Sequence, residues 1–287
     1  MSPIPARGVL LLTCPDKKGI VAAVANFIFQ NGGNIVHADQ HTDPGQGIFF
    51  QRLEWELDDF RIGRAELPGA FDNLAKQFGM QWSLHFSDAR PQIALFASLE
   101  AHCLYDLLAR YRMGEIQAEI PLVVSNHLAL KHVADTFGVE YYHFPVTPET
   151  RAAQERDVRL LLKERNIEVV VLARYMQVLG SDFVSQFPSR IINIHHSFLP
   201  SFVGPRPYHQ AFERGVKVIG ATAHYVTEEL DQGPIIVQDV ASVSHRDTVA
   251  DLIYKGRDLE KSVLARALNL HLARRVLPYG KKTIVFE

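Results

Sequence analysis

A run of aliphatic residues that ends in polar side chains is the most chemically suggestive part of the 287-residue chain. Residues 189–193 read SRIIN, a pattern typical of a buried strand, and Asn193 and His195 stand where this strand should end. Because the two are two positions apart, their side chains point to the same side of an extended backbone. An amide can donate to a developing oxyanion, and a histidine can transfer protons near neutral pH. The pair therefore predicts chemistry on a carbonyl group.

An acid that could complete this pair lies further along the chain. Residues 215–240 read as two strands that flank the loop TEELDQG, and Asp231 lies in that loop close to Gly233. A carboxylate beside a histidine fixes the tautomer of the ring and favours its charged form. We therefore expect Asn193, His195 and Asp231 to act together on a carbonyl carbon, with the segment LPSFVG, residues 199–204, folded back over them.

The residues after position 88 alternate between strand patterns and helix patterns, and the chain ends with a long helix and a short strand. The strand patterns are clearest at 92–98, 120–126 and 167–173. The long helix is expected at about 247–276 and the short strand at 283–287. Such alternation predicts an α/β domain with a doubly wound, mostly parallel sheet that helices cover on both faces. Ligands of such sheets lie at the carboxyl ends of the strands, where SRIIN places its polar residues.

Residues 8–86 have a different pattern and predict a smaller domain. Its elements follow the order β-α-β-β-α-β, which is the ferredoxin-like arrangement. The polar segment SDARP, residues 87–91, links the two parts, so we place one domain at 1–87 and the other at 88–287. One layer of helices leaves the outer face of a small sheet uncovered, which predicts a homo-oligomer, either a dimer or a tetramer.

Composition and charge exclude several classes of protein. The formal net charge of -2 gives no basic surplus to bind a phosphate backbone, so we expect neither nucleic acid nor a membrane surface as a partner. No apolar stretch approaches the length of about 18 residues that a transmembrane helix needs, and the N-terminus lacks a signal-peptide pattern. Cys14 and Cys103 are too few for a disulfide framework. We expect free thiols in a reducing compartment and thus a cytoplasmic protein.

Two segments carry a resemblance to a known family. NIHHSFLPSFVG at 193–204, followed by HYVTEELDQGPIIVQ at 224–238, resembles the signature of the folate-dependent formyltransferases. The resemblance implies that the asparagine, histidine and aspartate named above are catalytic. VLARYMQVLG at 171–180 is similar to the folate-pocket segment of that family. The implied substrate-binding residues are Met176, Val178, Leu179, His196, His224, Val226 and Leu230.

Residues 8–86 resemble an ACT domain, which implies an amino-acid effector at Asp16, Gly19 and Asn34. Asp16 also precedes the helical pattern KKGIVAAV, and the simpler interpretation is that it caps this helix. An ACT domain ahead of a formyltransferase-like domain is similar to the folate deformylases. This arrangement implies hydrolysis of 10-formyltetrahydrofolate to formate and tetrahydrofolate, which would supply formate for purine biosynthesis and balance the one-carbon folate pools. Folate would be the substrate, and no cofactor is expected.

Two departures from the wider family favour hydrolysis over transfer. His196 stands where the transferases commonly have a proline. The glycine-rich phosphate loop of the glycinamide ribonucleotide transferases is replaced by SLEAHCLYDLL. Without its backbone donors a phosphorylated acceptor has nothing to bind, and water becomes the nucleophile.

Three alternatives stay open. The protein could transfer the formyl group to a small amine, or it could be an inert folate- or amino-acid-binding regulator, although a regulator needs no complete catalytic set. A zinc hydrolase could use several histidines with Asp231, but no local spacing such as His-Glu-x-x-His is present, so we expect no metal. The histidines that could bind zinc together with Asp231 are His195, His196, His209, His224 and His245.

Another strand pattern is rich in histidine and carries His37, Asp39 and His41. We expect this strand to face water or a partner subunit.

Overall fold

The structure is a computed structural model, and it describes residues 5–200 and 206–287. The chain divides into two compact units, each of which we describe separately. The first unit extends to Ala89 and also includes 273–277 and 284–287, whereas the second comprises 90–272 and 278–283. The sequence predicted a boundary near residue 88 but assigned the whole C-terminal part to the second domain. Residues 201–204 of the segment expected to cover the site lie outside the described residues.

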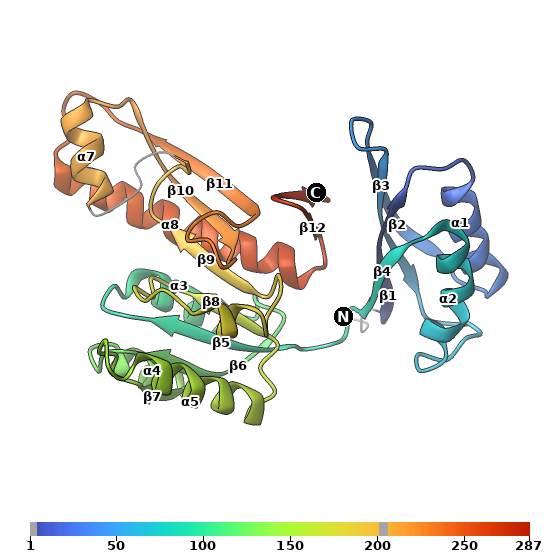
Figure 1. The fold of residues 1–287 in the computed structure, drawn as a ribbon, viewed down its shortest axis with the longest axis horizontal. Coiled ribbons are helices and arrows are strands. Elements are labelled where there is room, and N and C mark those ends of the chain that lie inside the picture. The colour runs from blue at the N-terminus through green and yellow to red at the C-terminus, as the bar shows by residue number, and fades with distance from the viewer. Residues whose placement is uncertain (1–4, 201–205) are drawn as a thin grey trace. The chain divides into compact units, whose positions relative to one another are not determined.

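The first unit has the predicted β-α-β-β-α-β order. Its strands form an antiparallel sheet in the order β2-β3-β1-β4, and both helices lie on one face of this sheet (Figure 1). Alternate strand residues such as Leu10 and Trp55 pack against Ile20 and Phe71 of the helices. The elements are β1 (Arg7–Pro15), α1 (Ile20–Gln30), β2 (Ile35–Asp43), β3 (Ile48–Glu56), α2 (Leu67–Phe78) and β4 (Gln81–Phe86).

The middle of the opposite face of this sheet is buried, contrary to the expectation that it lacks cover, whereas on the edge strand β2 His37 and Asp39 are partly exposed and His41 is exposed. Phe50 and Arg52 of β3 point away from the helices, yet they are only 0% and 2% exposed. The Arg52 guanidinium donates to the backbone carbonyls of Ala273 and Arg274, at 3.2 Å and 3.0 Å. The C-terminal segment of the chain therefore contacts this face. An uncovered sheet face is thus no argument for an oligomer.

The start of α1 also differs from the prediction. The residue before the helix is Gly19, with φ of 93°, and no side chain caps the helix. Asp16 is not the N-cap, because α1 begins four residues later, at Ile20. Its backbone N–H donates to the Gly47 carbonyl at 2.8 Å and extends the pairing of β1 with β3, before the chain turns into α1. Only a residue that tolerates the left-handed conformation can stand at position 19, which explains the glycine there.

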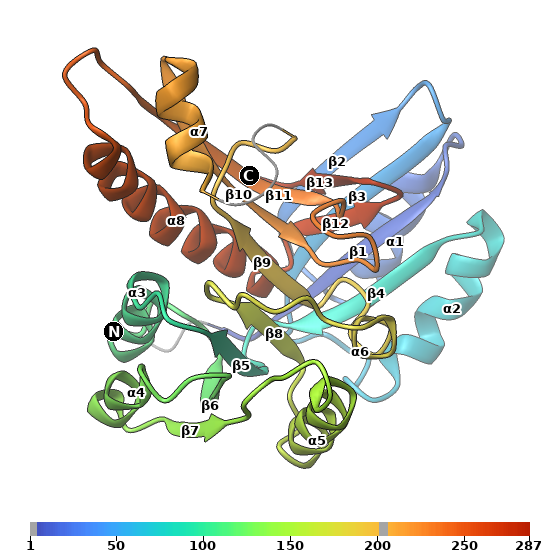
Figure 2. The same ribbon diagram turned by 60° about the vertical axis from the view of Figure 1, so that its left-hand side comes forward.

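The second unit is a seven-stranded sheet in the order β11-β10-β9-β8-β5-β6-β7. Neighbouring strands from β9 to β7 are parallel, and β10 and β11 run antiparallel at one edge. Helices α3 and α8 lie on one face, and α5 and α6 lie on the other (Figure 2). The elements are β5 (Gln92–Ala97), α3 (His102–Arg112), β6 (Glu119–Ser125), α4 (Lys131–Phe137), β7 (Glu140–His143), α5 (Arg151–Glu164), β8 (Val169–Leu172), α6 (Ser181–Val184), β9 (Ile191–His195), α7 (Pro207–Arg214), β10 (Val218–Tyr225), β11 (Ile235–Ser242) and α8 (Val249–Leu272).

This topology determines where a ligand can bind. The strand order reverses between β5 and β8, because β6 and β7 follow β5 on one side while β8 and β9 lie on the other. In open α/β sheets, such a reversal leaves a crevice at the carboxyl ends of the strands. The sequence prediction of a doubly wound, mostly parallel sheet is confirmed. A small hairpin of β12 (Val276–Tyr279) and β13 (Lys282–Val285) ends the chain, and no helix in the described part of the chain has the length and apolarity needed to span a membrane.

The close packing of α8 on α7 leads to a stability prediction. Gly256 lies inside α8, and a Cβ at this position would overlap the phenol of Tyr208. Gly256→Ala should therefore lower the free energy of unfolding by about 1–3 kcal/mol. Gly69 lies in α2 with open space around it, so Gly69→Ala should raise that free energy by about 0.5–1 kcal/mol. Denaturant unfolding of each variant beside the wild type measures both, and equal stability of the two variants would contradict the packing.

Candidate active site

Strand register brings three polar side chains together at the carboxyl end of β9. Asn193 and His195 lie two residues apart on this strand and share one face. The antiparallel pairing of β9 with β10 places His224 directly opposite Asn193, and the Asn193 amide nitrogen is 3.2 Å from His224 Nε2. The structure thus adds a second imidazole to the predicted pair by cross-strand pairing.

The loop between β10 and β11 delivers the acid. Asp231 has φ of 55°, a left-handed conformation that aspartate tolerates better than most residues. The loop is closed at its base, where the Tyr225 N–H donates to the Pro234 carbonyl at 2.9 Å. Gly233 packs so closely on the Tyr225 carbonyl that no Cβ would fit. This close approach fixes the loop, and with it the acid, against β10.

The Asp231 carboxylate lies between the two imidazoles. One of its oxygens is 3.2 Å from His195 Nδ1, and the other is 3.5 Å from His224 Nε2. Hydrogen bonding by His195, and then by His224, lowers the pKa of Asp231 well below its ordinary range and outweighs the effect of burial. An ionised carboxylate can only accept hydrogen bonds, so it favours a proton on His195 Nδ1. His195 Nε2 then carries a lone pair, and it has no hydrogen-bond partner in the described part of the chain.

His224 has a defined tautomer as well. Its Nδ1 is 2.9 Å from the Tyr225 carbonyl oxygen, which can only accept. A neutral ring therefore carries its proton on Nδ1 and accepts from the Asn193 amide at Nε2, whereas a charged ring donates from Nε2 to Asp231. An amide nitrogen has two protons, so one N–H of Asn193 remains for a substrate oxygen.

A cavity of about 290 Å³ opens beside these groups. Its walls are the segment after β8, the end of β9 and the loop that carries Asp231, and it contains every residue predicted for catalysis and substrate binding. Met176, Val178 and Leu230 are 59%, 49% and 61% exposed, so apolar side chains are available at the cavity for a flat, partly apolar ligand. The ten predicted residues brought together here are Asn193, His195, Asp231, Met176, Val178, Leu179, His196, His224, Val226 and Leu230.

Among the lining residues that sequence reasoning missed are Arg174, Tyr175 and Gln177. All three lie in VLARYMQVLG, a segment in which only apolar residues were predicted to bind the substrate. A signal was present in the arginine, since a charged residue directly after a buried strand is unusual in a core segment. Arg174 has φ of 64° and a side chain that is only 13% exposed.

His196 is held in its neutral form. Burial, and then the nearby Arg174 guanidinium, lower the pKa of His196 to about 4. Its ring centre is 5.4 Å from that of His195 and 6.1 Å from that of Tyr208. A neutral second ring thus lies directly beside the ring that would carry protons.

The predicted effector residues are not joined by any recorded interaction within residues 5–200 and 206–287. The Asn34 amide donates to a Glu56 carboxylate oxygen at 2.8 Å. The Asp16 backbone N–H donates to the Gly47 carbonyl, and Gly19 precedes α1. An effector site at these three residues stays a prediction.

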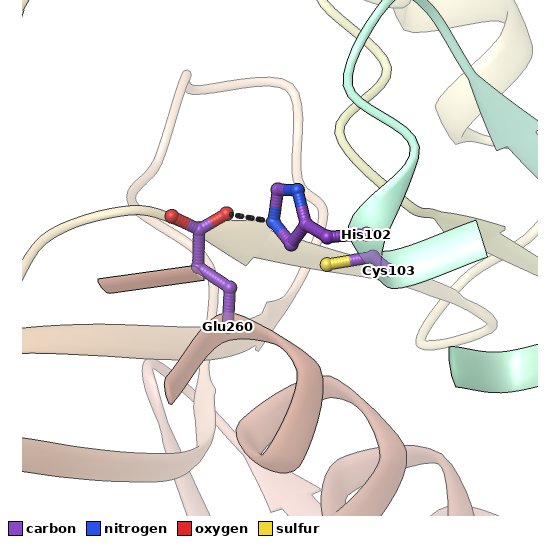
Figure 3. Close-up of side chains that lie close together, drawn as sticks. All are labelled: His102, Cys103 and Glu260. Carbon is purple, nitrogen blue, oxygen red and sulfur yellow. Dashed lines mark hydrogen bonds and ion pairs between the residues drawn. The ribbon is translucent and has the colours of Figure 1, made fainter. Parts of the chain in front are cut away.

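One group of possible metal ligands occurs among the described residues, and none of the five histidines suggested as zinc ligands belongs to it. His102 and Cys103 open α3, and Glu260 reaches them from α8 (Figure 3). The carboxylate is already engaged, because His102 Nε2 is 2.8 Å away, Tyr208 donates to it at 2.6 Å and Arg174 Nε is 3.4 Å away. Burial, and then the Glu260 charge, raise the pKa of the Cys103 thiol, which disfavours the thiolate that binds metal. We call Glu260, His102, Tyr208 and Arg174 the Glu260 cluster, an internal ion-pair network.

Comparison with known proteins agrees with this architecture. Residues 91–268 match the formyl transferase family, and residues 8–59 match the ACT domain. The fold and site thus define a protein of the formyl transferase class. The formyltetrahydrofolate deformylase of Synechocystis sp. is 58% identical over 277 residues, which are 96% of this chain and 97% of that protein. The chain belongs to the formyltetrahydrofolate deformylase family.

Other relatives show how far the likeness extends. The formyltetrahydrofolate deformylase of Escherichia coli strain K12 is 43% identical over 97% of this chain and 98% of its own length. A crystal structure of the Pseudomonas syringae deformylase has a TM-score of 0.97 at 45% identity, covering 100% of this chain and 96% of that one. Glycinamide ribonucleotide transformylase 1 of Symbiobacterium toebii has a TM-score of 0.65 at 31% identity, covering 69% of this chain and 95% of its own.

The contact between Gly233 and Tyr225 gives a test of the loop that carries the acid. Gly233→Ala places a Cβ against backbone, which cannot move aside as a flexible side chain can, so Asp231 must shift. A misplacement of about 1 Å can cost about 100-fold in rate, and we expect a loss of turnover of that order. Gly63→Ala, where a Cβ would meet only ordinary contacts, is the control and should keep full activity. Wild-type turnover in Gly233→Ala would show that the loop does not need this close approach.

Proposed function

We propose that this protein hydrolyses 10-formyltetrahydrofolate to formate and tetrahydrofolate. The observation that carries the proposal is the ionised Asp231 beside His195 Nδ1, at a cavity with half-exposed apolar side chains. The name that the curated relatives share, formyltetrahydrofolate deformylase, supports the substrate and the reaction. In this proposal 10-formyltetrahydrofolate is the substrate, and Asn193, His195 and Asp231 carry out its hydrolysis.

The first step is attack of water on the formyl carbon. His195 Nε2 takes a proton from the water, and the Asp231 carboxylate at 3.2 Å stabilises the imidazolium that forms. General base catalysis of this kind contributes about 100- to 10,000-fold in rate. A carbon–oxygen bond forms, and the carbonyl electrons move onto the oxygen.

The second step is collapse of the tetrahedral intermediate. The free N–H of Asn193 and the charged His195 stabilise the oxyanion, and one such donor is worth about 2.7–4 kcal/mol in other enzymes. His195 then returns its proton to the leaving nitrogen as the carbon–nitrogen bond breaks. The products are tetrahydrofolate and formic acid, which ionises to formate. The leaving group is an arylamine and so a weaker base than an alkylamine.

The second unit also supports water, rather than a phosphorylated amine, as the nucleophile. A phosphate acceptor needs free backbone donors at a helix N-terminus or free cations. Here Glu100 lies two residues ahead of α3 and binds Arg257 at 2.8 Å. The Glu100 carboxylate would repel a dianion at the start of α3, and it occupies the Arg257 guanidinium. A transferase that uses a small uncharged amine is the alternative that the assay below separates.

We further infer an amino-acid effector at the first unit, which its ACT family match supports. Exposed apolar side chains on this unit, among them Phe29 at 76% and Val21 at 41%, support a homo-oligomer. The two buried free cysteines, Cys14 and Cys103, support a reducing, cytoplasmic setting. Formate released there would feed purine biosynthesis and adjust the one-carbon folate pools.

An assay without any acceptor tests the proposed reaction. Purified protein given 10-formyltetrahydrofolate should release formate and tetrahydrofolate in equal amounts, because water alone completes the reaction. Release of formyl groups only when an amine is added would make the protein a transferase. Folate binding without turnover would make it an inert regulator.

The assigned roles are tested by two variants. Asp231→Asn and His195→Ala should lower turnover by about 100- to 10,000-fold, since each removes general base catalysis, while binding of tetrahydrofolate survives. Asp157→Asn, an equivalent change on the exposed side of α5, is the matched control and should keep full turnover. Near wild-type rates in either active-site variant would refute its role.

A further inference from the structure

A second cavity adjoins the candidate active site within the second unit. It has a volume of about 590 Å³ and lies where α3 and α7 begin. It shares Arg174, Met176 and His196 with the first cavity, so the two meet beside the reacting end of the site. No motif predicted it, because its walls come from segments near residues 100, 174, 206 and 257.

We propose that this second cavity is the route by which water enters and formate leaves while tetrahydrofolate still occupies the first cavity. The inference rests on the proposed deformylase reaction and assigns a binding site to its small product. The ligand is a small monocarboxylate anion.

The proposed reaction has a use for a second route to the reacting centre. A folate ligand would contact the first cavity through Met176, Val178 and Leu230, which are its half-exposed apolar residues. Each turnover nevertheless consumes one water and produces one formate at Asn193 and His195. His196 lies next to His195 and lines both cavities, so the second cavity reaches the reacting centre from another side.

The charges of the second cavity suit one small anion. Three arginines and two glutamates line it. Arg257 pairs with Glu100 at 2.8 Å, and Arg174 lies 3.4 Å from Glu260. The side chain of Arg206 has no hydrogen bond or ion pair with any residue that the structure describes. One positive charge is therefore in excess, which matches a monoanion rather than a phosphate dianion.

Two further features determine the charge that an anion meets in the second cavity. The neutral ring of His196 adds no charge at the junction of the cavities, where Arg174 lies 3.4 Å from Glu260. His102 and Pro207 line the second cavity and are the first residues of α3 and α7, so the positive ends of two helices lie at its wall, and the Glu100 charge ahead of α3 is paired with Arg257. The helix ends and the Arg206 charge together favour an anion in the second cavity.

Formate binding in the presence of saturating tetrahydrofolate tests the proposal. Line broadening of ¹³C-formate in NMR spectra should show that wild-type protein binds formate with tetrahydrofolate already bound. Arg206→Gln removes the unpaired charge and should weaken this binding by about three- to tenfold, the worth of one partly exposed charge-assisted contact. Arg214→Gln, at the opposite end of the same helix and about 12 Å away, is the matched control and should leave it unchanged.

Product inhibition provides the second readout. Formate should inhibit turnover even at saturating 10-formyltetrahydrofolate, and Arg206→Gln should relieve this inhibition. Competition between formate and tetrahydrofolate for one site, or equal effects of the Arg206 and Arg214 variants, would overturn the inference. In that case the acceptor-free assay still reports formate release by the wild type. A wild type that releases no formate would instead refute the proposed function itself.

Discussion

The site depends on one carboxylate held between two imidazoles. Asp231 lies 3.2 Å from His195 and 3.5 Å from His224, and these contacts keep it ionised by lowering its pKa. An ionised acid in a partly buried site needs such partners, because burial alone would favour its neutral form. In return it determines where His195 carries its proton. In the proposed reaction, activation of the water, stabilisation of the oxyanion and protonation of the leaving nitrogen all depend on that proton.

Ordinary elements of the fold bring these groups together. β9 ends at a reversal of strand order, its antiparallel pairing with β10 places His224 opposite Asn193, and the close packing of Gly233 on Tyr225 fixes the loop with the acid. On the other side of Arg174, the Glu260 cluster joins α3, α7 and α8. Arg174 and His196 thereby line both of the cavities that adjoin the site.

The sequence predicts what local pattern and spacing determine. The alternation of strands and helices predicted both folds, and the two-residue spacing of Asn193 and His195 predicted their common face. The failures concern contacts between distant segments: Glu260 meets His102 across 158 residues, and the C-terminal segment covers a sheet face that the pattern left bare. Asp16 was misassigned as a cap because a capping residue type and a turn residue type look alike before the backbone is known.

The central claim is the position of one proton, and ¹⁵N NMR of histidine-labelled protein measures it directly. Nδ1 and Nε2 of a neutral ring have distinct ¹⁵N shifts, and these identify the tautomer of His195. We predict that the neutral ring of His195 carries its proton on Nδ1, facing Asp231, and has a free lone pair on Nε2. A proton found on Nε2 instead would mean that Asp231 does not orient this ring, and water activation by His195 would lose its basis.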